Sequence, residues 1–220
     1  MTKAQLRAQT AKFAGDPDQT RYSTQYDDAL NRAQEQFALE TRALWEDEPY
    51  TTSSGTAAYN LPADFMWEDW ITYDGAEMVP ISRHEIQRIY GSDWASQEGT
   101  PTHVIVDPEE GRKTFTLVPI PQEAKSVVMR YYPLPAELTS DSQVPLNASS
   151  LMAQFHMGIA AFAGWLLLMG EESTASVVKK QDGLMAVWND ATDKAINLFK
   201  NTASAGLKVR GNRFSGVEWS

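Results

Sequence analysis

The stretch LMAQFHMGIAAFAGWLLLMG, residues 151–170, contains no charged side chain and decides the fold of the chain. Its 20 residues are about the length needed to cross a bilayer. However, Gln154 and His156 interrupt its start, and no lysine or arginine flanks it closely, so the anchors typical of a membrane helix are missing. The stretch therefore predicts a helix buried on all sides in a bundle, and no membrane partner.

Small residues on this helix predict where another helix comes close. Ala160 and Gly164 lie four residues apart on one helical face, and neither has a side chain that would hold a neighbour away. A helix that is apolar all round in so short a chain also predicts burial against a neighbouring subunit. We therefore expect Ala160, Gly164, Trp165 and Trp188 to take part in packing between subunits.

The last third of the chain predicts a pair of helices. The first opens at 146–148 with Asn147 as its cap and ends at Gly170, and the second begins at 171–173 and ends near Gly206. Apolar or semi-apolar positions recur along the second helix in alternating steps of four and three, which is typical of paired helices. These positions are Val177, Gln181, Leu184, Trp188, Ala191, Ala195 and Leu198.

The first segment also predicts helices. A short helix over residues 4–13 is ended by Gly15, and Ser23 caps a second helix that runs to about Trp45. Steps of three and four mark one buried face of the second helix. That face carries Tyr26, Leu30, Ala33, Phe37, Thr41 and Leu44.

Between the helices, the pattern changes to short strands and turns. Asp74-Gly75 between two apolar runs predicts a tight hairpin, and residues 102–106 and 114–118 predict a second one with a longer loop. Ser82 caps a short helix, and residues 127–132 form a further strand. The strands are mostly antiparallel, and no spacing indicates the βαβ units of a parallel sheet.

The fold class is therefore α+β, a helical bundle with an inserted, mostly antiparallel strand-rich lateral domain. Residues 1–47 supply the N-terminal helices, 48–146 the insert, 147–204 the C-terminal helical pair and 205–220 an extended tail.

Charge is distributed unevenly along the chain. The net charge is −10, and residues 47–146, with sixteen acidic and six basic side chains, carry the whole excess. Residues 205–220 carry a net charge of +2. So acidic a chain is a poor candidate for wrapping nucleic acid, because phosphates would repel it. The excess predicts either a solvated face, or a surface that faces a polyanion without binding it or meets a basic partner.

No pattern in the sequence points to catalysis. The chain has no cysteine, and it has neither a nucleophile elbow nor a phosphate-binding glycine loop. His84, His103 and His156 are far apart, and none belongs to a metal-binding pair. We therefore predict no catalytic, cofactor-binding or metal-binding residues, no cofactor and no enzymatic activity.

The seven tryptophans are scattered over the chain, so core and interface packing is the first interpretation for them. Trp219 is the exception, because it lies one residue from the end of a basic segment. A lone indole there is better suited to a pocket on a partner, and a disordered terminus is the alternative.

The order of these segments, together with several local motifs, resembles the head–tail adaptor (connector) proteins of tailed bacteriophages, a family that includes proteins like tail tubular protein A. The segment over residues 59–65 is similar to the family's Tyr-x-Leu-Pro-x-Asp-Phe pattern. Further motifs follow in order: residues 71–75 (ITYDG), 99–101 (GTP), 117–121 (LVPIP), 131–135 (YYPLP) and 144–146 (VPL). The resemblance covers about residues 20–200.

The resemblance implies a passive structural role in the virion neck, between head and tail. Members of the family form a ring, usually of twelve copies, beneath the portal protein. The ring continues the channel for viral DNA, which passes without specific binding, and it docks a downstream tail or nozzle protein. Absence of cysteine suits assembly in a reducing host cytoplasm.

The resemblance also implies that terminal segments reach into neighbouring subunits or the portal. We therefore expect the tail to dock on the portal through Lys208, Arg210, Arg213, Phe214 and Trp219.

Three other interpretations remain open. The chain could be another virion component of the same layout, such as a tail-completion or stopper protein. It could be a soluble ligand-binding module whose pocket is lined by Trp67, Trp70, Tyr73 and Trp94. The last alternative is an enzyme that uses a carboxylate together with His84 or His103.

Overall fold

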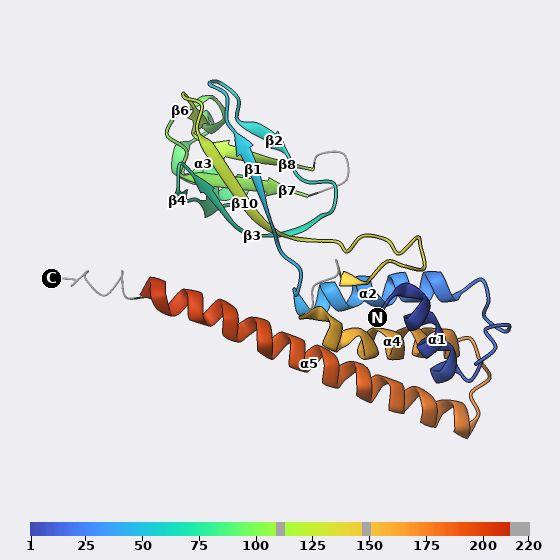
Figure 1. Cartoon of the computed structure of the whole chain (residues 1–220). Helices are drawn as coiled ribbons and strands as arrows, with labels where there is room; N and C mark the ends of the chain where they lie inside the picture. Colours follow the sequence, from blue (N-terminus) through green and yellow to red (C-terminus); the bar gives the residue numbers. More distant parts are fainter. Residues whose placement is uncertain (109–112, 147–150, 212–220) are drawn as a thin grey trace. The chain divides into compact units, whose positions relative to one another are not determined.

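The chain divides into two compact units (Figure 1). The helical unit comprises Met1–Leu44 and Pro135–Ser220, and the strand unit comprises Trp45–Leu134. The computed structural model describes residues 1–108, 113–146 and 151–211, and of residues 200–211 it describes the backbone alone. The predicted α+β class is confirmed.

Helix α4 (His156–Leu168) is the centre of the helical unit, and three other helices pack against it. These are α1 (Lys3–Ala14), α2 (Tyr26–Thr41) and α5 (Ala175–Gly211). Nine of the 13 residues of α4 are buried, which confirms the prediction of a helix enclosed within a bundle. In the described part of the chain, no helix is long and apolar enough to cross a membrane.

The predicted helical faces are the ones that are buried. On α2, Tyr26, Leu30, Ala33 and Phe37 are fully buried, and on α5 the seam residues from Leu184 to Ala195 are buried as well. Trp188 of this seam packs edge-on against Phe37 and stacks on Phe162 of α4. The steps of three and four therefore correctly predict which side of each helix faces the core.

Three helix starts differ from the sequence-based expectation, and the first is that of α5, which begins at Ala175 and not at 171–173. Asn147, the predicted cap, lies outside the described residues; the α-helix begins at His156, after the 3₁₀ turn η3 (Met152–Phe155). Ser23 does not cap α2, which begins at Tyr26. The reason is local, because the Asp16 carboxylate accepts hydrogen bonds from the backbone N–H groups of residues 20–22 and holds that segment in turns.

Helix α5 continues past Gly206, at which the sequence places its end, to Gly211. A glycine inside a helix costs only about 1 kcal/mol relative to alanine, and alanine, leucine and lysine around it favour the helix. The prediction of an extended tail is therefore wrong for residues 205–211, and residues 212–220 lie outside the described part.

The strand unit contains two four-stranded sheets and a short pair of strands. Sheet A has the order β1 (Glu46–Thr51), β10 (Ser126–Pro133), β3 (Phe65–Tyr73) and β4 (Ala76–Glu77). Sheet B has the order β2 (Ala58–Asn60), β8 (Thr114–Val118), β7 (His103–Asp107) and β5 (Val79–Pro80). The pair consists of β6 (Glu98–Gly99) and β9 (Ile120–Pro121).

Both predicted hairpins are present. Asp74 and Gly75 connect β3 to β4 with φ angles of 49° and 81°, the left-handed values that a two-residue hairpin turn requires. Strands β7 and β8 pair antiparallel over their whole length. Two parallel pairings, β5 with β7 and β6 with β9, were not expected. Strands β5, β6 and β9 are two residues long, too short for an alternating pattern to indicate them.

The strand unit has three layers. Ile71, Val127 and Met129 of sheet A pack against Val104 and Phe115 of sheet B in one core. On the other face of sheet B, Ile86 of helix α3 (Arg83–Tyr90) packs with Ile105 and Val118. The layers of the unit therefore follow in the order α3, sheet B and sheet A, and the outer face of sheet A is one surface of the unit.

Replacing Gly158 by alanine is expected to destabilise the helical unit. A Cβ atom at Gly158 would lie 2.5 Å from the Cβ of Ala191 on α5, so the two helices would have to separate. We expect a loss of about 1–3 kcal/mol in the free energy of unfolding measured in urea. Gly183→Ala is the matched control: nothing lies within 4 Å of its Cβ position, and alanine there should add about 0.5–1 kcal/mol. Equal effects of the two changes would contradict this account of the packing.

Candidate assembly surfaces

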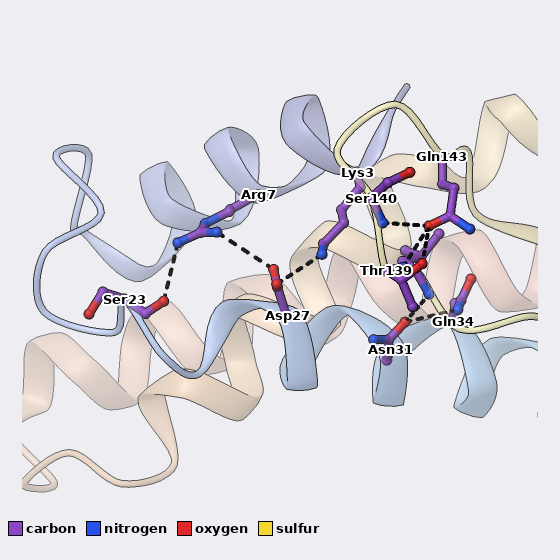
Figure 2. Close-up of polar contacts among 10 residues, drawn as sticks. Lys3, Arg7, Ser23, Asp27, Asn31, Gln34, Thr139, Ser140 and Gln143 are labelled. Atoms are coloured by element: carbon purple, nitrogen blue, oxygen red, sulfur yellow. Dashed lines mark hydrogen bonds and ion pairs between the residues drawn. The ribbon is translucent and has the colours of Figure 1, made fainter.

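The segment over residues 135–146, through which the chain returns from the strand unit, is fixed onto the helical unit by amide side chains (Figure 2). The Gln34 amide of α2 donates to the backbone carbonyl of Ala136 at 2.9 Å, and the backbone N–H of Leu138 donates to Asn31 Oδ1 at 2.8 Å. Gln143 accepts from two backbone N–H groups of the same segment. This segment therefore belongs to the helical unit and contributes a defined surface to it.

Helix α1 is attached to the segment over residues 135–146 by a backbone hydrogen bond and to α2 by charge. The backbone N–H of Lys3 donates to the carbonyl of Gln143 at 2.7 Å. The Lys3 ammonium, whose side chain is 4% exposed, donates to the Asp27 carboxylate at 2.8 Å, and the Arg7 guanidinium lies 3.6 Å from Asp27. Figure 2 shows Asp27 between the two cations. A nearly buried ammonium depends on such a partner, because desolvation makes an unpaired charge costly.

The outer face of sheet A carries an arginine held between two indoles. The Arg130 guanidinium lies 4.4 Å from the ring centre of Trp45 and 4.8 Å from that of Trp70. It also donates two hydrogen bonds, of 2.7 and 2.8 Å, to the Asp47 carboxylate. The hydrogen bond and charge of Arg130 hold the pKa of Asp47 below its ordinary value, against the effect of burial.

A register shift gathers further aromatic side chains on this face. Residues three apart in a regular strand point to opposite faces. Here the pairing shifts between Arg130↔Trp70 and Tyr131↔Glu68, so that Trp67 pairs with Tyr132 two positions along β10 from Arg130. Trp67 and Trp70 therefore share the outer face. Trp45 is 53% exposed and Trp67 38% exposed.

The neighbouring glutamates belong to the opposite face of sheet A, because Glu46 and Glu68 pair with Tyr131 and Glu48 pairs with Met129, both of them buried in the core. The outer face, which we call the aromatic face, is defined by Trp45, Asp47, Trp67, Trp70, Arg130 and Tyr132.

A separate groove of about 560 Å³ lies at the other edge of sheet A, beside β4 and β5. Its lining includes Tyr73, Val79 and the ion pair between Asp74 and Lys125, whose charged atoms are 3.1 Å apart. The hydrogen bond with Asp74 raises the pKa of Lys125.

The four candidates for a ligand pocket do not converge. Only Tyr73 lines the groove; Trp67 and Trp70 lie on the aromatic face, and Trp94 lies beside Arg83 in the short helix η1 (Trp94–Ser96). The structure therefore gives no support to a ligand pocket built from these four residues.

The three histidines also lie apart. His156 is buried in the bundle, His84 is exposed on α3, and His103 contacts Thr102 and Tyr90. Over the described ranges, no group of three metal-ligating side chains is close enough to hold an ion.

The residues expected to pack between subunits are mostly used inside the chain. Ala160, Gly164 and Trp188 are buried, and Gly164 lies against α1, where a Cβ would be 3.1 Å from the Cβ of Phe13. Trp165 is half-buried and stacks on Phe162. The close helix approach expected at Ala160 and Gly164 is present, but α1 of the same chain supplies it.

The expected docking residues lie at the C-terminal end. Lys208 and Arg210 lie on helix α5, where the backbone alone is described. Arg213, Phe214 and Trp219 lie outside the described residues.

Sequence analysis did not single out the aromatic face. The tryptophans at 67 and 70 and the surrounding acidic residues are visible in the sequence, but the shifted pairing that puts both indoles on one face is not. Arg130 is the only basic residue between Lys125 and Lys179, and that isolation within an acidic segment is the one available signal.

A bundle closed around an apolar helix, with a sheet unit that exposes tryptophans, is an arrangement suited to protein contacts, and comparison places the chain among bacteriophage adaptor proteins. The chain belongs to the SU10 adaptor protein family, whose model matches residues 1–213. No curated protein matches the chain. The match covers both units, confirms the predicted resemblance and makes the protein a virion component.

Removing the charge of Asp27 is expected to loosen α1. Asp27→Asn leaves the Lys3 ammonium without its carboxylate, and because Asp27 itself is half exposed we expect a loss of only about 1 kcal/mol. Asp28→Asn, in an exposed pair with Arg32, is the control and should change stability by less than about 0.5 kcal/mol. The measurement is urea unfolding at low salt. An equal effect of both changes would mean that the Lys3 pair contributes nothing specific.

Stability is expected to depend on the protonation of His156. Burial, and next the positive N-terminal amine, whose nitrogen lies 2.7 Å from Nδ1, lower the pKa of His156 to about 4. The unfolded chain binds a proton near pH 6.5 and the folded chain does not, so stability falls as the pH drops from 6.5 towards 4. Relative to His156→Gln, the wild type should lose about 2–3 kcal/mol between pH 7 and 4.5 in urea unfolding. Parallel pH profiles would show that His156 is already charged in the fold.

Proposed function

We propose that the protein is a head–tail adaptor that forms a ring, of twelve copies, beneath the portal of the virion. The observation that carries this is the family match over residues 1–213, which spans the helical unit, the strand unit and the start of the C-terminal segment. In this proposal the ring continues the DNA channel in the neck, after assembly in the host cytoplasm, and docks the downstream tail or nozzle protein. No catalytic step is part of this role.

The charge distribution supports passage of DNA without retention. A protein that neutralises phosphates binds DNA with an affinity that rises with each contact. The acidic excess of residues 47–146 works against such contacts. DNA moving through a ring of these chains would therefore experience little electrostatic drag, provided that the carboxylates face the channel.

The C-terminal segment is the part proposed to dock on the portal. It carries a net charge of +2, and it combines Lys208, Arg210 and Arg213 with Phe214 and Trp219. Arginine and tryptophan are enriched among the residues that dominate binding energy at protein interfaces.

The decisive experiment mixes the purified chain with purified portal rings and measures the mass of the complex. A complex with one adaptor ring per portal supports the proposal even if the free chain is a monomer. If a cryo-EM map of the virion places the density elsewhere than the neck, the protein is instead another completion component.

Deleting the C-terminal segment is expected to abolish joining and leave the fold intact. Deletion of residues 212–220 leaves helix α5 whole, and deletion of 207–220 also removes Lys208 and Arg210. Both variants should unfold in urea at the same midpoint as the full chain but fail to co-sediment with portal rings. Infectious particles completed by either variant would show that the segment does not dock on the portal.

A further inference from the structure

Helix α4 has apolar side chains even where its own chain does not bury it. Nine of its 13 residues are buried, and the other four are Met157, Phe162, Trp165 and Leu166. Met169, which follows the helix, is 59% exposed. On α2, by contrast, the exposed residues are all charged, as is usual for the solvent side of a helix. The open side of α4 is therefore not built for contact with water.

The uncovered residues lie on different sides of the helix. Successive residues of an α-helix are rotated by about 100°, so Phe162, Leu166 and Met169 lie within about 60° of one another. We call these three residues the end patch. Met157, which is 42% exposed, lies near the other end of the helix and about 120–180° around it from the end patch. The helical unit thus has two separate apolar sites on one helix.

Two different apolar sites suit a ring better than a two-fold dimer. In a two-fold contact the same surface meets itself, whereas in a ring of more copies one surface of each copy meets a different surface of the next. The end patch and Met157 differ in both side and position along α4. In a ring, each of them is covered once by a neighbouring copy.

The distribution of charge favours the helical unit as the place where copies meet. The helical unit has 13 basic and 14 acidic side chains, a net charge of −1, whereas the strand unit has 6 and 15, a net charge of −9. Like charges that face each other disfavour association. Identical chains therefore meet at a lower electrostatic cost through their helical units than through their strand units.

The two sites also select the kind of occupant. Neither contains a charged or polar side chain, so DNA or a strongly charged protein gains nothing from them. Two ion pairs, Asp28–Arg32 on α2 and Asp190–Lys194 on α5, neutralise exposed charges of the helices that pack on α4. An uncharged, apolar occupant is favoured, and a second copy of this chain supplies one.

We propose that the end patch of one copy packs against the Met157 side of α4 in the next copy. This inference rests on the proposed adaptor function and names the surface through which the copies of the ring join. Helix α4 is then enclosed fully only in the ring, and the acidic strand units do not supply this contact.

The first test uses the absence of cysteine from the chain. The double variant Met157→Cys/Met169→Cys is mixed with purified portal rings and treated with a mild oxidant or a short bis-maleimide cross-linker. Twelve residues of helix separate the two positions by about 18 Å, too far for a disulfide within one copy. We expect a ladder of covalently linked copies on a denaturing gel. Each single variant should remain monomeric, because the two positions meet each other and not themselves.

The matched control is Val79→Cys/Ile89→Cys in the strand unit, where the replaced side chains are 56% and 57% exposed. It should give no ladder. A ring that forms without a ladder from the α4 pair would overturn the proposal, because something other than a second copy then covers α4. Dimers from Met169→Cys alone would indicate a two-fold contact and would also overturn it.

The second test introduces charge at the same positions. Met157→Glu/Met169→Glu should unfold in urea at the wild-type midpoint, because both side chains are exposed in the single chain. The concentration needed to fill the ring on the portal should rise at least roughly tenfold, because the contact would bury carboxylates without partners. Val79→Glu/Ile89→Glu adds the same charge to the strand unit and should fill the ring like the wild type.

The two proposals fail in different ways. If the wild-type chain forms no ring on the portal, the adaptor function itself is wrong, and the contact is wrong with it. If the wild-type ring forms and the α4 glutamate variant fills it equally well, only the proposed contact is wrong.

Discussion

Helix α4 is the constraint on which the helical unit depends. Apart from His156 at its start, all its side chains are apolar or small, so exposing any side of it to water is costly. Three helices cover it, and two glycines decide how closely they approach: Gly158 against α5 and Gly164 against α1. Helices from both ends of the chain must therefore be present before α4 is buried, and this explains how the chain can carry a long strand-rich insertion between them.

The segment that follows the insertion is held on the helical unit by polar contacts. The helical unit stops at Leu44 and resumes at Pro135. The strand unit between these two residues has its own core. Beyond Pro135, backbone groups of the segment to Gln143 bond to Asn31, Gln34 and Lys3. Buried hydrogen bonds of this kind contribute little net stability each, but they fix geometry because an unpaired partner is costly. These hydrogen bonds position the segment over residues 135–146, which therefore does not need a continuous apolar surface to stay in place.

The sequence predicts well what depends on local periodicity. The part of the α5 seam from Leu184 to Ala195, the buried face of α2 and the turn at Asp74-Gly75 all follow from spacing within a few residues. Predictions that depended on competition between local signals were less reliable. Ser23 is a good cap in isolation, but the Asp16 carboxylate engages the following backbone and moves the start of α2 to Tyr26. Gly206 is a typical residue for a helix end, but the residues around it favour the helix, which continues to Gly211.

The candidate interface shows the limit of sequence reasoning more clearly. The composition around Trp67 and Trp70 is visible, but the face each side chain occupies depends on the register with β10, which lies about sixty residues away and shifts at Tyr131. Likewise, Ala160 and Gly164 correctly predict a close helix approach, but their spacing carries no information on which chain supplies the partner. Small apolar residues such as Ala160 and Gly164 are buried in the chain's own core, because a bundle of this size must bury them to be stable. Among the described residues, the tryptophans that stay exposed, Trp45 and Trp67, lie in the strand unit, where the register of β3 with β10 decides which face they occupy.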